Sequence, residues 1–198
     1  MSENSDETNN YDDELWIEHI RNGDEYAFEM LFKKYYLPLT RFAWRYVNSK
    51  AVAEELVQEL FTILWEKKET WHTGGSVRSY LYKSVRNLSL NHLKHQGVKQ
   101  EFDHEWMEQK ENPQIEFRDE YREQQIREAI AKAIEELPER SKMTYKLHRY
   151  DGLTYPEIAD VMGVSVKTVE SQMTRTLKIL RERLAWLLPF LVIALMAG

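Results

Sequence analysis

The sequence predicts an all-α protein, built as two small helical domains joined by an acidic linker. Apolar residues recur at spacings of three and four along most of the 198 residues, and no segment shows the alternation of apolar and polar residues that is typical of a strand. The 5 prolines and 7 glycines fall mostly between these periodic segments, which indicates short connections. A hydrophobic content of 42% is sufficient for helical cores, and the length is compatible with two domains.

The amino-acid composition excludes several classes of function. The chain has no cysteine, which excludes disulfides, thiolate catalysis and cysteine-ligated zinc. His92 and His95 lie three residues apart, but no carboxylate or cysteine completes a metal-binding set around them. No paired carboxylates or histidines stand at catalytic spacing either, so we predict neither an enzyme nor a cofactor or metal site. The amino terminus, MSENSDETNNYDDE, is acidic and polar where a secretion signal is basic and apolar. We therefore expect a cytoplasmic protein whose residues 1–12 are disordered.

Charge is distributed unevenly along the chain, and this distribution is more informative than the net charge of −6. Residues 72–100 contain five lysines and arginines and no acid. Residues 165–183 also carry more basic than acidic side chains, whereas acids gather near the amino terminus and again over residues 101–128. Two basic segments separated by an acidic one indicate two nucleic-acid-binding modules with a spacer between them.

The first domain is predicted over residues 13–97, and chain-breaking residues define its early helices. A helix that includes Trp16 ends at Asn22-Gly23, and a second helix is predicted to end at Pro38. Asn48-Ser49 then caps a long amphipathic helix, whose apolar stripe is Val52, Leu56, Leu60 and Ile63.

This amphipathic helix has an acidic and polar patch on its other side. Glu55, Gln58 and Glu59 recur at helical spacing, with Thr62 one turn further on. The pattern alone leaves two interpretations open, a solvated helix face or a docking patch for a basic helix of a partner.

A basic helix follows the Gly74-Gly75 loop and is capped by Ser76. Its outward side chains combine basic groups with an amide: Lys83, Arg86, Asn87 and Lys94. Trp71 and Tyr82 accompany these basic groups. Aromatic rings in such a setting either stack on unpaired bases or belong to the core.

The linker is predicted over residues 98–120, and the second domain as four helices over residues 121–184. Helices begin at Tyr121 and at Pro138, and the last two helices form a helix-turn-helix.

Three signals define this helix-turn-helix. Thr154 and Glu157 form a capping box at the start of its short first helix. Gly163 supplies the turn, and Ser165 caps the longer second helix.

The second helix of this motif has two faces. Residues at spacings of three and four form a predicted apolar stripe: Val166, Val169, Met173, Leu177, Leu180 and Leu184. The opposite face has hydroxyl, amide and guanidinium groups, which suit base edges and phosphates in a major groove: Thr168, Ser171, Gln172 and Arg175. The polar surface of an ordinary helical hairpin has the same pattern and remains an alternative.

Four segments in this order resemble the extracytoplasmic-function (ECF) group of bacterial RNA polymerase sigma factors. They are AFEMLFKKYYLPLTRFAWRYV, AEELVQELFTILWE, SYLYKSVRNLSLNHLK and the stretch from ELPERSKMTYKLHRYDGLTYPEIADVMG to LRERL. The likeness covers about residues 26–184. It implies a sigma region 2 domain over residues 13–97 and a region 4 domain over residues 121–184.

The resemblance assigns roles by position. In that family, the helix that matches AEELVQEL docks on the clamp helices of the polymerase β′ subunit, which implies polymerase contacts for Glu55, Gln58 and Glu59. The segment that matches residues 79–94 melts the promoter and recognises the minus-ten element; a flipped base would be held by Asn87 and Asn91, and phosphates by Lys83, Arg86 and Lys94. The helix-turn-helix would recognise the minus-thirty-five element through Lys167, Thr168, Ser171, Gln172 and Arg175. Two positions depart from the pattern, because many members have an acid in place of Asn91 and a basic residue in place of Glu170.

The implied function is that of a sigma factor that binds core RNA polymerase through its β′ and β subunits, directs it to specific promoters and helps melt them. An anti-sigma factor is a further expected partner, whereas no cofactor or small-molecule substrate is expected. The alternative is a stand-alone helix-turn-helix regulator that does not engage the polymerase.

The apolar tail, LAWLLPFLVIALMAG from Leu184, is not required by the family pattern. It is shorter than the about 20 apolar residues of a spanning helix, and Pro189 interrupts it. For residues 185–198 we favour burial against the sigma domains or an anti-sigma factor over membrane association.

Overall fold

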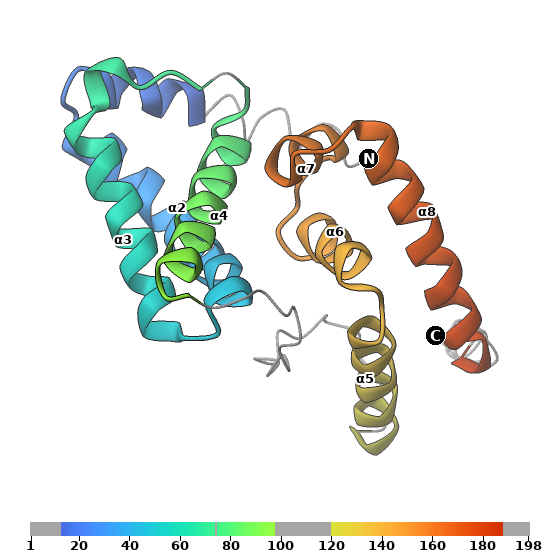
Figure 1. Cartoon of the computed structure of the whole chain (residues 1–198). Helices are drawn as coiled ribbons and strands as arrows, with labels where there is room; N and C mark the ends of the chain where they lie inside the picture. The colour runs from blue at the N-terminus through green and yellow to red at the C-terminus, as the bar shows by residue number, and fades with distance from the viewer. Residues whose placement is uncertain (1–12, 74, 98–119, 188–198) are drawn as a thin grey trace. The chain divides into compact units, whose positions relative to one another are not determined.

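The computed structural model describes residues 13–73, 75–97 and 120–187, so nearly all of the predicted linker and most of the apolar tail lie outside the described residues. Within those ranges all regular elements are helices, which confirms the all-α prediction (Figure 1). The chain divides into two compact units, residues 1–104 with 153–164 and residues 105–152 with 165–198. None of the described helices combines the length and the apolar character needed to cross a membrane.

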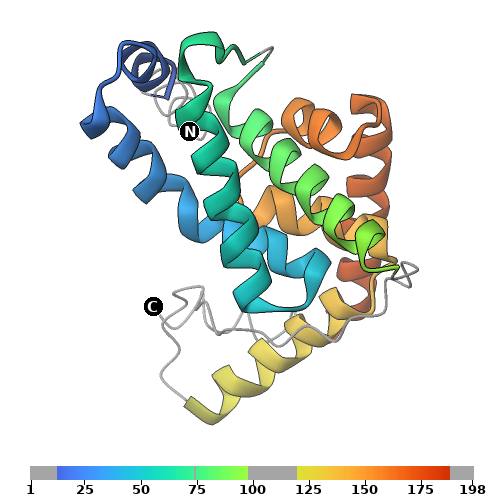
Figure 2. The ribbon, with the colours of Figure 1, turned by 60° about the vertical axis from the view of Figure 1, so that its left-hand side comes forward.

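The first unit is organised around the long helix α2, Glu25–Val47, which packs against α3, Lys50–Glu66, and α4, Val77–His95 (Figures 1 and 2). A helical segment over residues 13–21 precedes α2, and the 3-10 helix η1, Lys68–Thr70, follows α3. Apolar side chains at helical spacing form the core between these helices, among them Leu31, Leu39, Phe42, Val57 and Leu81.

Helix α2 continues through Pro38, so the prediction that it ends there is wrong. Proline lacks the backbone N–H of a helix interior, which normally kinks or breaks a helix. Here the flanking residues Leu31, Leu39 and Phe42 are all fully buried on the same side of the helix. Tertiary burial on both sides of the proline therefore overrides the local signal. The helix ends nine residues later at Val47, and its C-cap is Asn48, whose φ is 49° and whose N–H donates to Trp44 O.

Serine caps begin the next two long helices, as the sequence predicts. Ser49 Oγ accepts a hydrogen bond from the Val52 N–H at 3.4 Å, and Ser76 Oγ accepts one from the Ser79 N–H at 3.1 Å. Each cap satisfies one backbone donor that the first turn of the helix leaves unpaired. The starts of α3 and α4 are therefore fixed by local chemistry.

Asp13 fastens the first helical segment to α2. Its side chain is buried and accepts hydrogen bonds from Lys34 Nζ at 2.6 Å and from the Tyr35 hydroxyl at 2.5 Å. Burial, and after it the negative charge of Asp13, raises the pKa of Tyr35 well above its usual value.

Trp71 and Tyr82 belong to the core. The exposed fractions of their side chains are 4% and 1%, and the Tyr82 ring lies 5.0 Å from the Phe42 ring between centroids. A base cannot stack on rings that are covered in this way, so the stacking interpretation is wrong for both residues.

Helix α7, Tyr155–Met162, packs against α4 and groups with the first unit. Its ends match the sequence signals, because Thr154 and Glu157 form the capping box and Gly163 takes the left-handed conformation with φ of 67°. The sequence-based division instead places residues 153–164 in the second domain, and its domain boundaries remain a prediction.

The second unit contains α5, Glu120–Glu135, α6, Glu139–Arg149, α8, Val166–Arg183, and the 3-10 helix η2, Ala185–Leu187. Helices α6 and α8 lie side by side, and α5 contacts α8 (Figure 1). An apolar cluster in the described part of this unit includes the buried residues Ala133, Ile134, Leu137 and Leu180.

The buried stripe of α8 differs from the predicted one: Leu184 is only partly buried, and three further positions also differ. Val166 and Leu177 are 39% and 49% exposed, whereas Thr176 is fully buried. The stripe is therefore Val169, Met173, Thr176 and Leu180. The prediction from apolar character alone placed the buried stripe part of a turn away from its observed position. The buried side of α8 is the side that faces the neighbouring helices, and a threonine lies on that side.

Candidate functional site

Three exposed side chains of α3 form a compact group, here named the α3 patch: Glu55, Gln58 and Glu59. They lie three and four residues apart, so the helix places them on one face. The neighbouring residues Leu56 and Leu60 are buried against the rest of the unit. The patch therefore presents two carboxylates and an amide on a rigid helix, a surface that suits a basic partner.

Helix α4 presents four exposed polar side chains in a row, here named the α4 stripe: Lys83, Asn87, Asn91 and Lys94. Their spacing of four, four and three residues keeps them on one face of the helix. Two amides between two lysines can contact base edges and phosphates in the same stretch of nucleic acid.

Arg86 is placed differently from the α4 stripe. Its side chain is half-buried and donates a hydrogen bond to the Tyr46 hydroxyl. Burial raises the pKa of Tyr46, and the charge of Arg86 opposes that rise only in part. In this structure Arg86 joins α4 to α2, and its contact with phosphate remains a prediction.

Lys83 is engaged by an acid of α7 within the first unit. Its Nζ lies 2.6 Å from Asp160 Oδ1, and Ser79 Oγ lies within hydrogen-bonding distance, 3.1 Å, of Asp160 Oδ2. The side chains of Lys83 and Asp160 are 48% and 45% exposed. An ion pair with this much exposure to water stabilises a protein by about 1 kcal/mol at most. Phosphate can therefore compete for this lysine. Sequence reasoning missed Asp160, because its partner is 77 residues away and no local pattern links them.

The predicted minus-thirty-five contacts lie along one side of α8, here named the polar face of α8: Lys167, Thr168, Ser171, Gln172 and Arg175. Lys167, Ser171 and Arg175 are exposed, whereas Thr168 and Gln172 are half-buried. Ser171 Oγ donates to Lys167 O at 2.8 Å, and Thr168 Oγ1 lies 2.8 Å from the capping hydroxyl of Ser165. Both hydroxyls are thus held by the helix itself.

Gln172 is held from outside the helix. Its Oε1 lies 2.7 Å from the hydroxyl of Thr144, a buried residue of α6. Sequence reasoning missed Thr144, which carries no motif and lies 28 residues from its partner.

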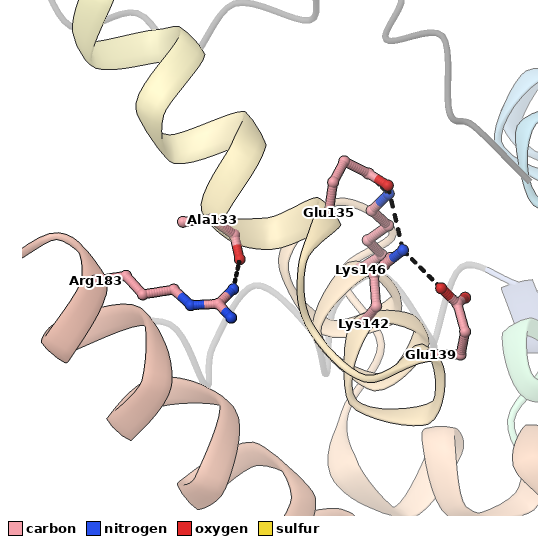
Figure 3. A network of polar contacts seen from close by, with 6 residues as sticks. All are labelled: Ala133, Glu135, Glu139, Lys142, Lys146 and Arg183. Carbon is pink, nitrogen blue, oxygen red and sulfur yellow. Dashed lines mark hydrogen bonds and ion pairs between the residues drawn. The ribbon is translucent and has the colours of Figure 1, made fainter. Parts of the chain in front are cut away.

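Ion pairs join α5 to α6, and a hydrogen bond joins α8 to α5 (Figure 3). Lys146 and Lys142 of α6 reach Glu135 of α5 at 2.6 and 3.3 Å. Arg183 of α8 donates to Ala133 O at 3.1 Å. Burial lowers the pKa of Lys142, but its hydrogen bond to Glu139 and the nearby carboxylates outweigh burial and raise that pKa.

No three histidine or acidic side chains of the described residues are grouped so that they could hold a metal ion.

Comparison with known proteins identifies the two parts of the chain. Residues 31–98 match the model of sigma-70 region 2, and residues 127–180 match the model of sigma-70, region 4. A curated relative, the ECF RNA polymerase sigma-E factor of Escherichia coli (strain K12), is 28% identical over 175 residues, which are 82% of this chain and 89% of that protein. The chain belongs to the ECF group of sigma factors. The RNA polymerase sigma-H factor of Pseudomonas aeruginosa is 26% identical over 176 residues, again 82% of this chain and 89% of that protein.

Two solved structures share the fold of this sigma factor. One is CnrH in complex with the cytosolic domain of CnrY, with a TM-score of 0.58, 21% identity and coverage of 88% of this chain and 97% of CnrH. The other is the sigma factor RpoE in complex with the anti-sigma factor NepR from Bartonella quintana, with a TM-score of 0.54, 20% identity and coverage of 80% and 96%. At these identities the likeness establishes the helical fold.

The region 2 match contains the α3 patch and the α4 stripe, and the region 4 match contains the polar face of α8. The candidate surfaces of this sigma factor therefore all lie within the segments that define its family.

Proposed function

We propose that this sigma factor binds core RNA polymerase through the α3 patch, holds melted minus-ten DNA on the α4 stripe and recognises the minus-thirty-five element with the polar face of α8. The observation that supports this proposal most is the α4 stripe, where two amides stand between two lysines on one exposed face inside the region 2 match. The proposal places the protein in the cytoplasm, with promoter DNA and polymerase as its partners.

The α3 patch is the proposed attachment point for the polymerase. Glu55 and Glu59 present negative charge from an exposed helix face. The clamp helices of the β′ subunit are the expected partner, and the β subunit would contact the remainder of the sigma factor. Complementary charge at such a surface speeds association and selects the partner.

The α4 stripe has the chemistry for an opened strand. An unstacked base exposes its Watson–Crick edge, to which the amides of Asn87 and Asn91 can both donate and accept hydrogen bonds. Lys83 and Lys94 lie at the two ends of the stripe and suit the flanking phosphates. In this arrangement the two amides would contact bases, and the lysines at the ends of the stripe would contact phosphates.

The polar face of α8 is suited to duplex DNA, because a helix of this kind enters a major groove with its N-terminal half. Arg175 is exposed one turn beyond Ser171 and is the guanidinium donor of the face. If it contacts a base, Arg175→Ala should lower promoter binding by about 1–3 kcal/mol and relax base preference at one position. A uniform loss across promoter sequences in an equilibrium binding assay would assign Arg175 to phosphate instead.

We further propose that an anti-sigma factor regulates the protein. The similarity of fold supports this proposal, since RpoE and CnrH were both solved with a protein partner bound. No small-molecule substrate is part of the proposal.

Run-off transcription with core polymerase tests the function. The full chain should direct a promoter-specific start, and the triple variant Glu55→Ala, Gln58→Ala, Glu59→Ala should lose both the start and binding to core polymerase. Glu69→Ala is the matched control, because it removes an exposed acid of η1 outside the α3 patch. Promoter DNA binding without any start, with an intact α3 patch, would leave the stand-alone regulator as the function.

A further inference from the structure

The side chain of Gln172 is the amide of the polar face of α8, and Thr144 of α6 holds it. Thr144 is 1% exposed, and its Oγ1 lies 2.7 Å from Gln172 Oε1 and 2.9 Å from Arg140 O. Gln172 itself is half-buried, so one side of its amide faces Thr144 while the helix face beyond it is open.

The hydroxyl of Thr144 has one hydrogen and two acceptors within reach. Arg140 O lies four residues earlier in the same α-helix, where it already accepts the backbone N–H of Thr144. Gln172 Oε1 is also at the shorter of the two distances. Because Gln172 Oε1 is the nearer of the two acceptors, we assign the hydrogen to the contact with Gln172.

This contact gives the Gln172 amide a direction. When Oε1 accepts from the threonine, the NH₂ group turns away from α6 and presents its two hydrogens. Such a group suits an acceptor, either N7 or O6 of a base edge or a phosphate oxygen. An amide without this anchor can rotate by half a turn and present its oxygen instead.

Thr144 is itself rigid. A β-branched side chain has few rotamers, and its neighbours Ser141 and Leu147 are buried. The ion pairs of Lys142 and Lys146 hold the same helix to Glu135 of α5 (Figure 3). A supporting residue of this kind keeps a contacting group within the narrow geometry that recognition requires.

We propose that Thr144 is a positioning residue that fixes the Gln172 amide as a hydrogen-bond donor and thereby sets the base preference of the helix-turn-helix at one position. This inference rests on the proposed recognition of the minus-thirty-five element by α8. Thr144 touches no DNA in this proposal and acts only through Gln172.

Three variants test the inference: Thr144→Val keeps the shape and removes the hydroxyl, Thr144→Ser keeps the hydroxyl, and Gln172→Ala removes the amide. The full chain with core polymerase is bound to a pool of promoter duplexes randomised in the upstream element, and bound DNA is sequenced. Thr144→Val should weaken the preference at one base pair by about threefold to tenfold. Thr144→Ser should retain that preference, and Gln172→Ala should lose it at the same base pair.

Coupling separates positioning from a purely structural role. The double variant Thr144→Val, Gln172→Ala should show the same base preference as Gln172→Ala alone, because both changes remove one interaction. An equal loss of affinity on all sequences in both single variants, again without further loss in the double variant, would identify a phosphate oxygen as the acceptor and overturn the inference that Thr144 sets a base preference. An unchanged base preference in Thr144→Val would overturn the inference. An equal change of base preference in Thr144→Val and Thr144→Ser, together with an equal change of their melting temperatures, would overturn it as well. If the unmodified chain shows no upstream base preference at all, the proposed function of α8 fails first, and the inference fails with it.

Discussion

Replacing Glu135 by glutamine should destabilise the second unit more than replacing Lys146 by methionine, although both changes break the same ion pair. Glu135 receives Lys146 at 2.6 Å and Lys142 at 3.3 Å. The exposed fractions of the three side chains are 4% for Lys146, 12% for Lys142 and 31% for Glu135. The carboxylate is thus the shared and more solvated partner, and the two ammonium groups are the buried ones.

These exposures determine the expected magnitudes. Glu135→Gln removes the carboxylate that lies 2.6 Å from the buried ammonium group of Lys146, and losing one partner of a fully buried pair costs roughly 3–5 kcal/mol. Because Glu135 is partly exposed and glutamine still accepts a hydrogen bond, we expect about 2–3 kcal/mol, or about 10–20 °C in melting temperature for a domain of this size. Lys146→Met keeps most of the packed volume, and Glu135 retains Lys142 and water. We expect that change to stay within about 1 kcal/mol.

Urea unfolding of the full chain, with hydrogen exchange of the α5 and α6 amides to localise the effect, measures both variants. Glu139→Gln is the matched control, because Glu139 contacts Lys142 at 2.7 Å but is 48% exposed. Its expected change is no more than about 0.5 kcal/mol. A Glu135→Gln variant as stable as Lys146→Met would refute the reasoning that the Glu135 carboxylate stabilises the buried ammonium group of Lys146.

Three further predictions concern the first unit and its turn. Burial raises the pKa of Tyr35 and Tyr46, so above about pH 10 the unfolded state loses phenolic protons that the folded state keeps. The free energy of unfolding should then fall by about 1.4 kcal/mol per pH unit for each tyrosine. Urea midpoints measured between about pH 9 and 11 should therefore fall less steeply with pH in Tyr46→Phe than in the unmodified chain. Asp160→Asn should release Lys83 and strengthen binding of single-stranded DNA about twofold to fivefold at low salt, as measured by fluorescence anisotropy; no change would mean that Lys83 does not reach phosphate. Gly163→Ala should cost about 1–2 kcal/mol in urea unfolding. Its φ is 67° and a Cβ there would meet no other atom within 4 Å, so a cost near zero would show that this turn can relax.

Local signals were sufficient to predict where helices begin and turn. Ser49, Ser76 and Thr154 cap their helices as their side-chain chemistry predicts, and Gly163 adopts the conformation that favours glycine. The prediction at Pro38 failed because the free energy that a proline costs inside a helix is smaller than the free energy gained by burying the apolar stripe on both sides of it.

Helical spacing likewise predicted which candidate site residues share a face, since three or four residues return a side chain to the same side. It could not predict partners from other elements. Arg86 turns to Tyr46, Lys83 to Asp160 and Gln172 to Thr144, across 28 to 77 residues of sequence. Each of these contacts depends on how helices pack, and no local pattern encodes that packing.

The two proposed nucleic-acid surfaces differ in how firmly their uncharged side chains are held, and this difference matches their proposed targets. On the α4 stripe, Asn87 and Asn91 are exposed side chains that can adjust to a base. On the polar face of α8, Ser171 is held by its own helix and Gln172 by α6. An opened DNA strand has no fixed geometry, so exposed amide side chains that can change rotamer suit it, because they become ordered together with the bound strand. Duplex DNA presents fixed positions in its groove, and groups that are already ordered bind there without a further loss of side-chain entropy.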